Sequence, residues 1–160
     1  MSSSPTIRPK TTVKLRAKAN CPSHSLANVE IRNLVVPVER GGTNIGPTPT
    51  DTALAALIGC TNVIGHKCAK SLDISVGHFD ISAVCGLRSA VCEFDRRGVT
   101  LAEEIDVPFQ RIHLSVETSE LVSQPDLDRL AAEVAKFCPL AKLFRQAGTE
   151  IIEEWTSSNN

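Results

Sequence analysis

The segment Asp51-Thr-Ala-Leu-Ala-Ala-Leu-Ile-Gly-Cys60-Thr-Asn-Val-Ile-Gly65 decides the fold of this chain. Thr50 or Asp51 can cap the free backbone N–H groups at its start, and the helical pattern continues to about Lys70. Residues 53–60 are apolar on every side of such a helix, which predicts burial all round. We therefore expect a long helix at the centre of a domain or of a dimer. Small side chains would let another backbone approach it closely, at Ala53, Ala55, Ala56 and Gly59.

The sequence on both sides of this helix predicts β-strands and two further helices. Three glycines and two prolines in the segment 41–51 predict a structured loop before the long helix. Period-two alternation and β-branched residues predict strands at 12–19, 29–38, 74–85, 90–95, 110–117 and 149–155, with turns at 20–25 and 96–98. Helical spacing predicts helices at 125–137 and 140–146. The order β-β-α-β-β-β-α-α-β is that of an α+β protein.

The composition predicts one soluble domain. The chain has 160 residues, 42% of them hydrophobic and 22% charged, and a net charge of −1. We expect a single domain at 11–156 between a flexible N-terminus at 1–10 and a flexible tail at 157–160. No basic patch predicts a nucleic-acid partner, and no apolar run predicts a membrane span or a signal peptide. We therefore expect a cytoplasmic protein.

The six cysteines are a chemical signal in a reducing compartment. There they are more often free, catalytic or metal-bound than joined in structural disulfides. No Cys-x-x-Cys or His-x3-His pair marks a zinc site. The sequence therefore predicts no metal and no cofactor. The side chains that could ligate zinc in such a site are His66, Cys68, His78, Cys85, Cys92 and His113.

Two cysteines lie in contexts that constrain a thiol. Cys60 lies mid-helix, where the helix dipole gives no help, so a nucleophilic Cys60 needs a cation such as an arginine from the N-terminal strands. The alternative is an inert cysteine packed in the core. Cys138 precedes Pro139, the expected first residue of a helix, and the free N–H groups there favour an anion. A structural role and a redox role both remain open for Cys138. If the fold joins the two thiols, they form a dithiol redox centre.

Four segments together resemble the OsmC/Ohr family, the osmotically inducible and organic hydroperoxide resistance proteins. They are Gly41-Gly-Thr-Asn-Ile-Gly-Pro-Thr-Pro-Thr-Asp51, residues 53–60, Val107-Pro-Phe-Gln-Arg-Ile112 and Phe137-Cys-Pro139. The resemblance implies an OsmC-like fold, with antiparallel sheets around a long central buried helix. It also implies an intertwined homodimer with sites at the subunit interface.

The resemblance further implies a thiol-dependent peroxidase that reduces organic hydroperoxides. Cys60 would become a sulfenic acid, Cys138 would resolve it as a disulfide, and a small dithiol such as a lipoyl group would reduce that disulfide. The family's peroxidases hold the thiolate with an arginine and a glutamate. Here Thr50 stands in the place of the glutamate, so Asp51 is the nearest carboxylate, and the arginine would be Arg40 or Arg32. The alternative function is an OsmC-like small-molecule binding protein without peroxidase turnover.

Overall fold

The computed structural model describes residues 12–85 and 94–158. Cys92 and most of the predicted strand at 90–95 lie outside the described residues. The chain divides into two compact units, which meet between Pro49 and Thr50. Each unit is described by itself. The predicted boundaries of a single domain stay a prediction.

The N-terminal unit contains a three-stranded antiparallel sheet in the order β1-β2-β3. The two strands predicted here were therefore wrong in number and position. Residues 12–17 have no regular structure, and the predicted turn at 20–25 is mostly strand. The run at 29–38 is split by a turn at Arg32, whose φ of 56° lies in the left-handed region that tight hairpin turns require. The strands are β1 (Lys18–Ser23), β2 (Leu26–Ile31) and β3 (Leu34–Glu39).

The predicted loop before the long helix is held by a buried carboxylate, which the sequence did not reveal. Glu39 is only 5% exposed, although it ends an otherwise apolar strand. Its Oε1 accepts hydrogen bonds from the backbone N–H groups of Gly41 and Thr43. The backbone N–H of Glu39 also donates to the carbonyl of Pro47, at 3.0 Å. One glutamate thus fixes both ends of the loop.

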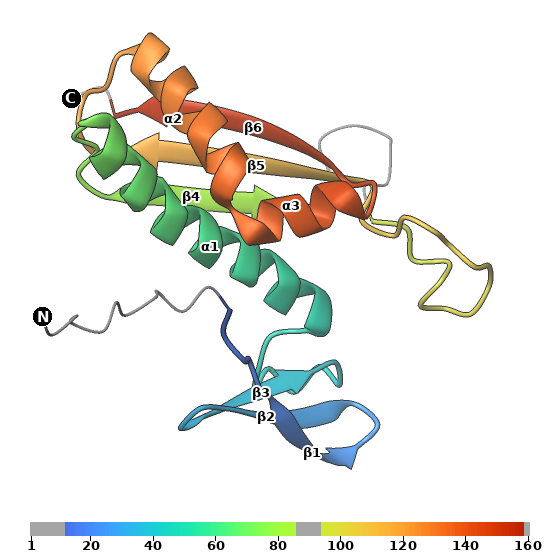
Figure 1. Cartoon of the computed structure of the whole chain (residues 1–160). Coiled ribbons are helices and arrows are strands. Elements are labelled where there is room, and N and C mark those ends of the chain that lie inside the picture. The colour runs from blue at the N-terminus through green and yellow to red at the C-terminus, as the bar shows by residue number, and fades with distance from the viewer. Residues whose placement is uncertain (1–11, 86–93, 159–160) are drawn as a thin grey trace, which may run out of the picture. The chain divides into compact units, whose positions relative to one another are not determined.

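The second unit holds a three-stranded sheet in the order β4-β5-β6 and three helices (Figure 1). β4 and β5 are antiparallel, as predicted. β5 and β6 are parallel, so the prediction of antiparallel pairing was wrong for this pair. The reason is that two helices lie between β5 and β6 and carry the chain back to the end where β5 began. The elements are α1 (Pro49–Leu72), β4 (Phe79–Val84), β5 (Arg111–Thr118), α2 (Gln124–Phe137), α3 (Pro139–Gln146) and β6 (Glu150–Ser157).

The core of this unit lies between the sheet and the helices. Every second side chain of β5 is buried, as the alternation of its sequence predicts. The two buried leucines and the one buried valine of α2 follow helical spacing and belong to the same apolar cluster. The buried side chains of these two elements are Ile112, Leu114, Val116, Thr118, Leu127, Leu130 and Val134.

The long helix α1 buries only one side. Leu57, Thr61 and Gly65 face the core, whereas the small residues Ala55, Ala56 and Gly59 are exposed. The prediction that this helix is buried on every side was therefore wrong for the single chain, because the described elements of this unit cover one face of α1 only. None of the helices in the described ranges is long and apolar enough to cross a membrane.

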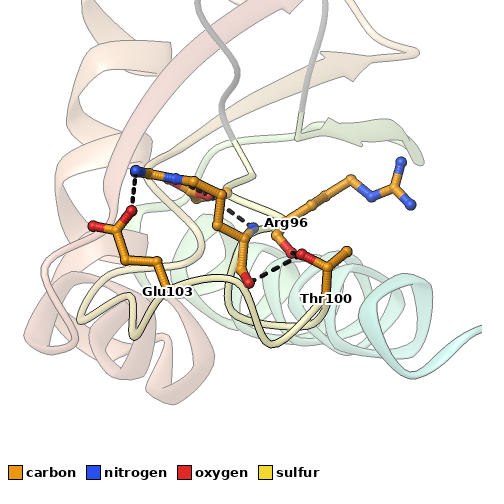
Figure 2. A network of polar contacts seen from close by, with 5 residues as sticks. Arg96, Thr100 and Glu103 are labelled. Atoms are coloured by element: carbon orange, nitrogen blue, oxygen red, sulfur yellow. Dashed lines mark hydrogen bonds and ion pairs between the residues drawn. The ribbon is translucent and has the colours of Figure 1, made fainter.

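Hydrogen bonds from one guanidinium group hold the loop at residues 95–105 in place. The Nε and Nη2 atoms of Arg97 donate to both carboxylate oxygens of Asp95, at 2.7 to 3.2 Å, and its Nη1 donates to Glu103 at 2.5 Å. Thr100 Oγ1 adds a bond to the carbonyl of Arg96, at 3.2 Å. Figure 2 shows Glu103 and Thr100 within this network and the Arg96 side chain pointing away from Glu103.

We expect Arg97→Gln to raise the pKa of Asp95. Hydrogen bonds from Arg97 hold the pKa of this carboxyl below its ordinary value. A depressed pKa stabilises the fold above the pKa of the unfolded chain, and this contribution is lost as the pH falls through the folded pKa. The loop should therefore lose stability as the pH falls. In Arg97→Gln this loss should begin at a higher pH than in the wild type. NMR titration of the Asp95 carboxyl carbon measures this. Arg96→Gln is the control, and an equal pKa in both variants would contradict the prediction.

Candidate thiol site

The second unit brings Cys60 and Cys138 together. Cys60 lies in the middle of α1, and Cys138 is the residue that ends α2 and begins α3. The chain turns a corner between α2 and α3 (Figure 1). Pro139 is the first residue of α3, as predicted, and its fixed φ suits that position. The two Sγ atoms are 3.2 Å apart, although 78 residues separate them in sequence. A disulfide needs a further approach to about 2.0 Å.

The two thiols differ in accessibility. Cys138 is fully buried, at 0% exposed, whereas Cys60 is half-buried. A dissolved reactant therefore reaches Cys60 first. Two large apolar side chains, Phe137 and Leu143, are each 61% exposed and lie close to Cys138 in the chain. The site thus has one reachable sulfur, one covered sulfur and exposed apolar groups nearby in the sequence.

The start of α3 supplies hydrogen bonds to both sulfurs. The backbone N–H of Ala141 donates to Cys138 Sγ at 3.5 Å. Burial raises the pKa of Cys60, the backbone N–H of Leu140 lowers it, and the hydrogen bond and charge of Cys138 raise it. The contribution of Leu140 was not predicted from the sequence. Pro139 was the available signal, because it places the first free N–H group at residue 140.

A third thiol, Cys68, lies farther along α1 and is 6% exposed. Burial raises its pKa, and the charges of Glu133 and Cys138 raise it further. Cys68 is thus kept protonated, as expected of a cysteine that packs in the core. Within the described ranges, no group of three histidine, cysteine or acidic side chains is placed to hold a metal ion.

The other predicted site residues lie apart from the two sulfurs or in the other unit. Asp51 is an exposed residue in the first turn of α1, about 13 Å along the helix axis from Cys60. Arg40 belongs to the N-terminal unit, where it is exposed and its backbone N–H donates to Ser25 O at 2.9 Å. Arg32 forms the turn between β2 and β3. The roles predicted for these three residues stay predictions.

The residue after Cys60 carries an unsatisfied polar group. Thr61 is 1% exposed, and its Oγ1 has no hydrogen-bond partner among the described residues. Burying a hydroxyl without a partner costs about 1–3 kcal/mol. The core packing next to Cys60 is therefore less stable than the apolar composition of this part of the core suggests.

We expect Thr61→Val to stabilise the protein by about 1 kcal/mol, because valine keeps the shape and removes the unsatisfied hydroxyl. Thr118→Val is the matched control. Thr118 is equally buried, but its Oγ1 donates to the carbonyl of Glu120 at 2.7 Å, so this change should cost about 1–2 kcal/mol. Urea unfolding measures both variants, and equal signs for the two would contradict the prediction.

The family model for OsmC, described as OsmC-like protein, matches residues 41–154 and so includes both thiols. The chain belongs to the OsmC-like family. This confirms the resemblance drawn from the sequence. No curated protein matches the chain.

Solved OsmC structures share the α+β fold. An OsmC-like protein from Mycoplasma pneumoniae is 17% identical with a TM-score of 0.73, and the match covers 92% of this chain and 99% of that one. An organic hydroperoxide resistance protein OsmC from Legionella pneumophila is 16% identical with a TM-score of 0.63, covering 94% and 100%. One from Elizabethkingia anophelis is 20% identical with a TM-score of 0.61, covering 94% and 99%. The predicted OsmC-like fold is therefore confirmed.

Proposed function

We propose that this OsmC-like protein is a thiol-dependent peroxidase that reduces organic hydroperoxides. The observation that carries the proposal is the 3.2 Å contact between a reachable and a fully buried thiol. Relatives described as organic hydroperoxide resistance proteins support the same reaction class. The exposed side chains of Phe137 and Leu143 favour an apolar substrate over hydrogen peroxide.

The reaction takes two steps. The Cys60 thiolate attacks the distal peroxide oxygen, the O–O bond breaks, and the leaving alkoxide takes a proton to become an alcohol. Cys60 is now a sulfenic acid. The sulfur of Cys138 then attacks the sulfur of Cys60, a disulfide forms, and the hydroxyl group leaves as water. The two sulfurs lose two electrons in all, and the peroxide gains two.

A brief pulse of cumene hydroperoxide should consume two thiols per chain and join Cys60 to Cys138. The buried Cys68 should stay reduced, because burial raises its pKa and so keeps this thiol protonated. Thiol counting and peptide mass spectrometry of the unreduced protein measure this. A disulfide that contains neither Cys60 nor Cys138 would refute the proposed cycle.

The partners of this cycle are part of the proposal. A small dithiol, such as a lipoyl group, would reduce the disulfide by thiol exchange. A second copy of the chain would cover the exposed Ala55, Ala56 and Gly59 face of α1, which makes the active form a homodimer. The thiols need a reducing compartment, so the proposed location is the cytoplasm.

One observation favours a second function, binding of an apolar small molecule without turnover. Burial raises the pKa of Cys60, which lowers the fraction of reactive thiolate at neutral pH. Thr50 also stands where the resemblance places a glutamate. The thiol count after the peroxide pulse separates the two functions, since a binding protein would keep both thiols.

A further inference from the structure

The position of Cys138 is set by the two helices that it joins. Its backbone N–H donates to the carbonyl of Val134 in α2 at 2.8 Å, and its carbonyl accepts from the N–H of Lys142 in α3 at 3.1 Å. Its sulfur is buried and accepts from the N–H of Ala141 at 3.5 Å. Both backbone groups of Cys138 thus belong to helical hydrogen bonds. The sulfur therefore moves whenever the corner between α2 and α3 moves.

A partly buried ion pair joins α3 to β6. Nη2 of Arg145, in the last turn of α3, donates to Oε1 of Glu153 on β6 at 2.5 Å. The Glu153 side chain is only 14% exposed. The neighbouring Phe144 packs against Phe109, with ring centroids 5.4 Å apart. Apolar contacts of this kind are non-directional, whereas a charge-assisted hydrogen bond has a fixed geometry. The ion pair therefore sets where α3 lies along β6.

The carboxylate of Glu153 is held by a second donor. Nε1–H of Trp155 donates to Oε2 of Glu153 at 2.9 Å, and Trp155 is 6% exposed. Glu153 and Trp155 are two residues apart on β6, so their side chains share one face of the strand. Because each carboxylate oxygen has its own donor, the carboxylate plane is fixed. Glu153 therefore receives Arg145 in one orientation.

Trp155 also contacts the strand on which α1 packs. Phe79 of β4 lies edge to face with Trp155, with ring centroids 6.0 Å apart, and edge to face with His66 of α1 at 4.5 Å. Gly65 permits this approach, since a Cβ there would lie 2.8 Å from the Phe79 ring. The two helices that carry or adjoin the paired thiols are thus both tied to Trp155, α1 through Phe79 and α3 through Glu153.

We propose that Arg145 and Glu153 are positioning residues that hold Cys138 where its sulfur attacks oxidised Cys60. This rests on the proposed function and concerns its second step. In that step the S–S bond forms, the S–O bond of the sulfenic acid breaks, and the thiol proton of Cys138 leaves with the hydroxyl group as water. Without the ion pair, the sulfenic acid lasts longer. A second hydroperoxide molecule then oxidises it to sulfinic acid and is itself reduced to an alcohol.

The first test needs no hydroperoxide. Reduced protein is equilibrated with mixtures of reduced and oxidised glutathione, where each Cys60–Cys138 disulfide formed consumes one glutathione disulfide and releases two glutathiones. Peptide mass spectrometry gives the equilibrium constant, which measures the effective concentration of one thiol at the other. Arg145→Gln should lower this constant about tenfold, because a misplacement of about 1 Å costs a well-oriented pair a factor of this order or more.

Lys136→Gln is the matched control. Lys136 lies two residues before Cys138, and its Nζ pairs with Glu133 at 2.6 Å, but both members of this pair belong to α2. The control therefore removes one positive charge near the buried thiol without cutting a link between α3 and β6. Its equilibrium constant should match that of the wild type. Equal constants in Arg145→Gln and Lys136→Gln would overturn the inference.

Glu153→Gln is the second variant, and it carries the comparison if Arg145→Gln does not fold. It should lower the constant by a similar factor, because glutamine has one acceptor oxygen and does not serve both Arg145 and Trp155. The double variant Arg145→Gln/Glu153→Gln should be no worse than either single variant, because the pair is already broken. Arg145→Lys keeps a cation and should restore most of the constant. Urea unfolding is measured alongside. A lower stability with a wild-type constant would mean a structural role only, against the inference.

The second test uses excess cumene hydroperoxide and compares the two products at Cys60. The ratio of disulfide to sulfinic acid should fall about tenfold in Arg145→Gln and stay at the wild-type value in Lys136→Gln. The two claims fail separately. Shifted glutathione constants in a protein that consumes no hydroperoxide would refute only the proposed function. Hydroperoxide consumption with equal constants and equal product ratios in both variants would refute only the positioning role.

Discussion

Cys60→Ser should abolish hydroperoxide consumption, with a loss of at least about a thousandfold in rate. A serine hydroxyl stays protonated near neutral pH and does not form the sulfenic acid that the cycle needs. Cys60 is the only one of the paired thiols that a dissolved substrate reaches, because Cys138 is 0% exposed. Cumene hydroperoxide loss, with a small dithiol as reductant, measures the effect.

Cys138→Ser is the informative companion to this variant. It should keep the first step, because Cys60 remains, but lose the disulfide. One equivalent of hydroperoxide should convert Cys60 to sulfenic acid, and a second equivalent should oxidise it to sulfinic acid when peroxide is in excess. Full multiple turnover in Cys138→Ser would remove Cys138 from the cycle, and unchanged consumption in Cys60→Ser would remove Cys60.

Leu130→Ala should have the largest effect on stability, a loss of about 3 kcal/mol in the free energy of unfolding. Leu130 lies on α2, is 0% exposed and belongs to the apolar cluster between the helices and β5. Truncation removes apolar burial and leaves a cavity, because the neighbouring strand and helices relax only in part. Urea unfolding followed by circular dichroism gives the difference.

Leu121→Ala is the matched control, since Leu121 is 80% exposed and precedes the same helix. Its cost should stay below about 0.5 kcal/mol. A similar loss in both variants would mean that helix propensity or the unfolded state, and not core packing, sets the stability of this region.

The helices were the most predictable part of the fold. α1 begins at Pro49 and ends at Leu72, close to the predicted start at Thr50 or Asp51 and end near Lys70. The start of α3 at Pro139 was also predicted. These helix boundaries depend on capping residues and on the spacing of apolar residues over a few positions. Both features can be read directly from a sequence. The hairpin turn at Arg32 was missed, because no glycine marks its left-handed conformation.

The sequence by itself determined two separate thiol contexts, one in the middle of a long apolar helix and one at the start of a short helix. Only the tertiary structure decided that these contexts form one site, with sulfurs 3.2 Å apart across 78 residues. It also decided that Cys60 is reachable, that Cys138 is covered and that Leu140 serves Cys60. The physical reason is the difference between local and long-range interactions. Caps and helical periods follow from neighbouring residues, whereas burial and donors at a sulfur depend on how distant elements pack around the shared core.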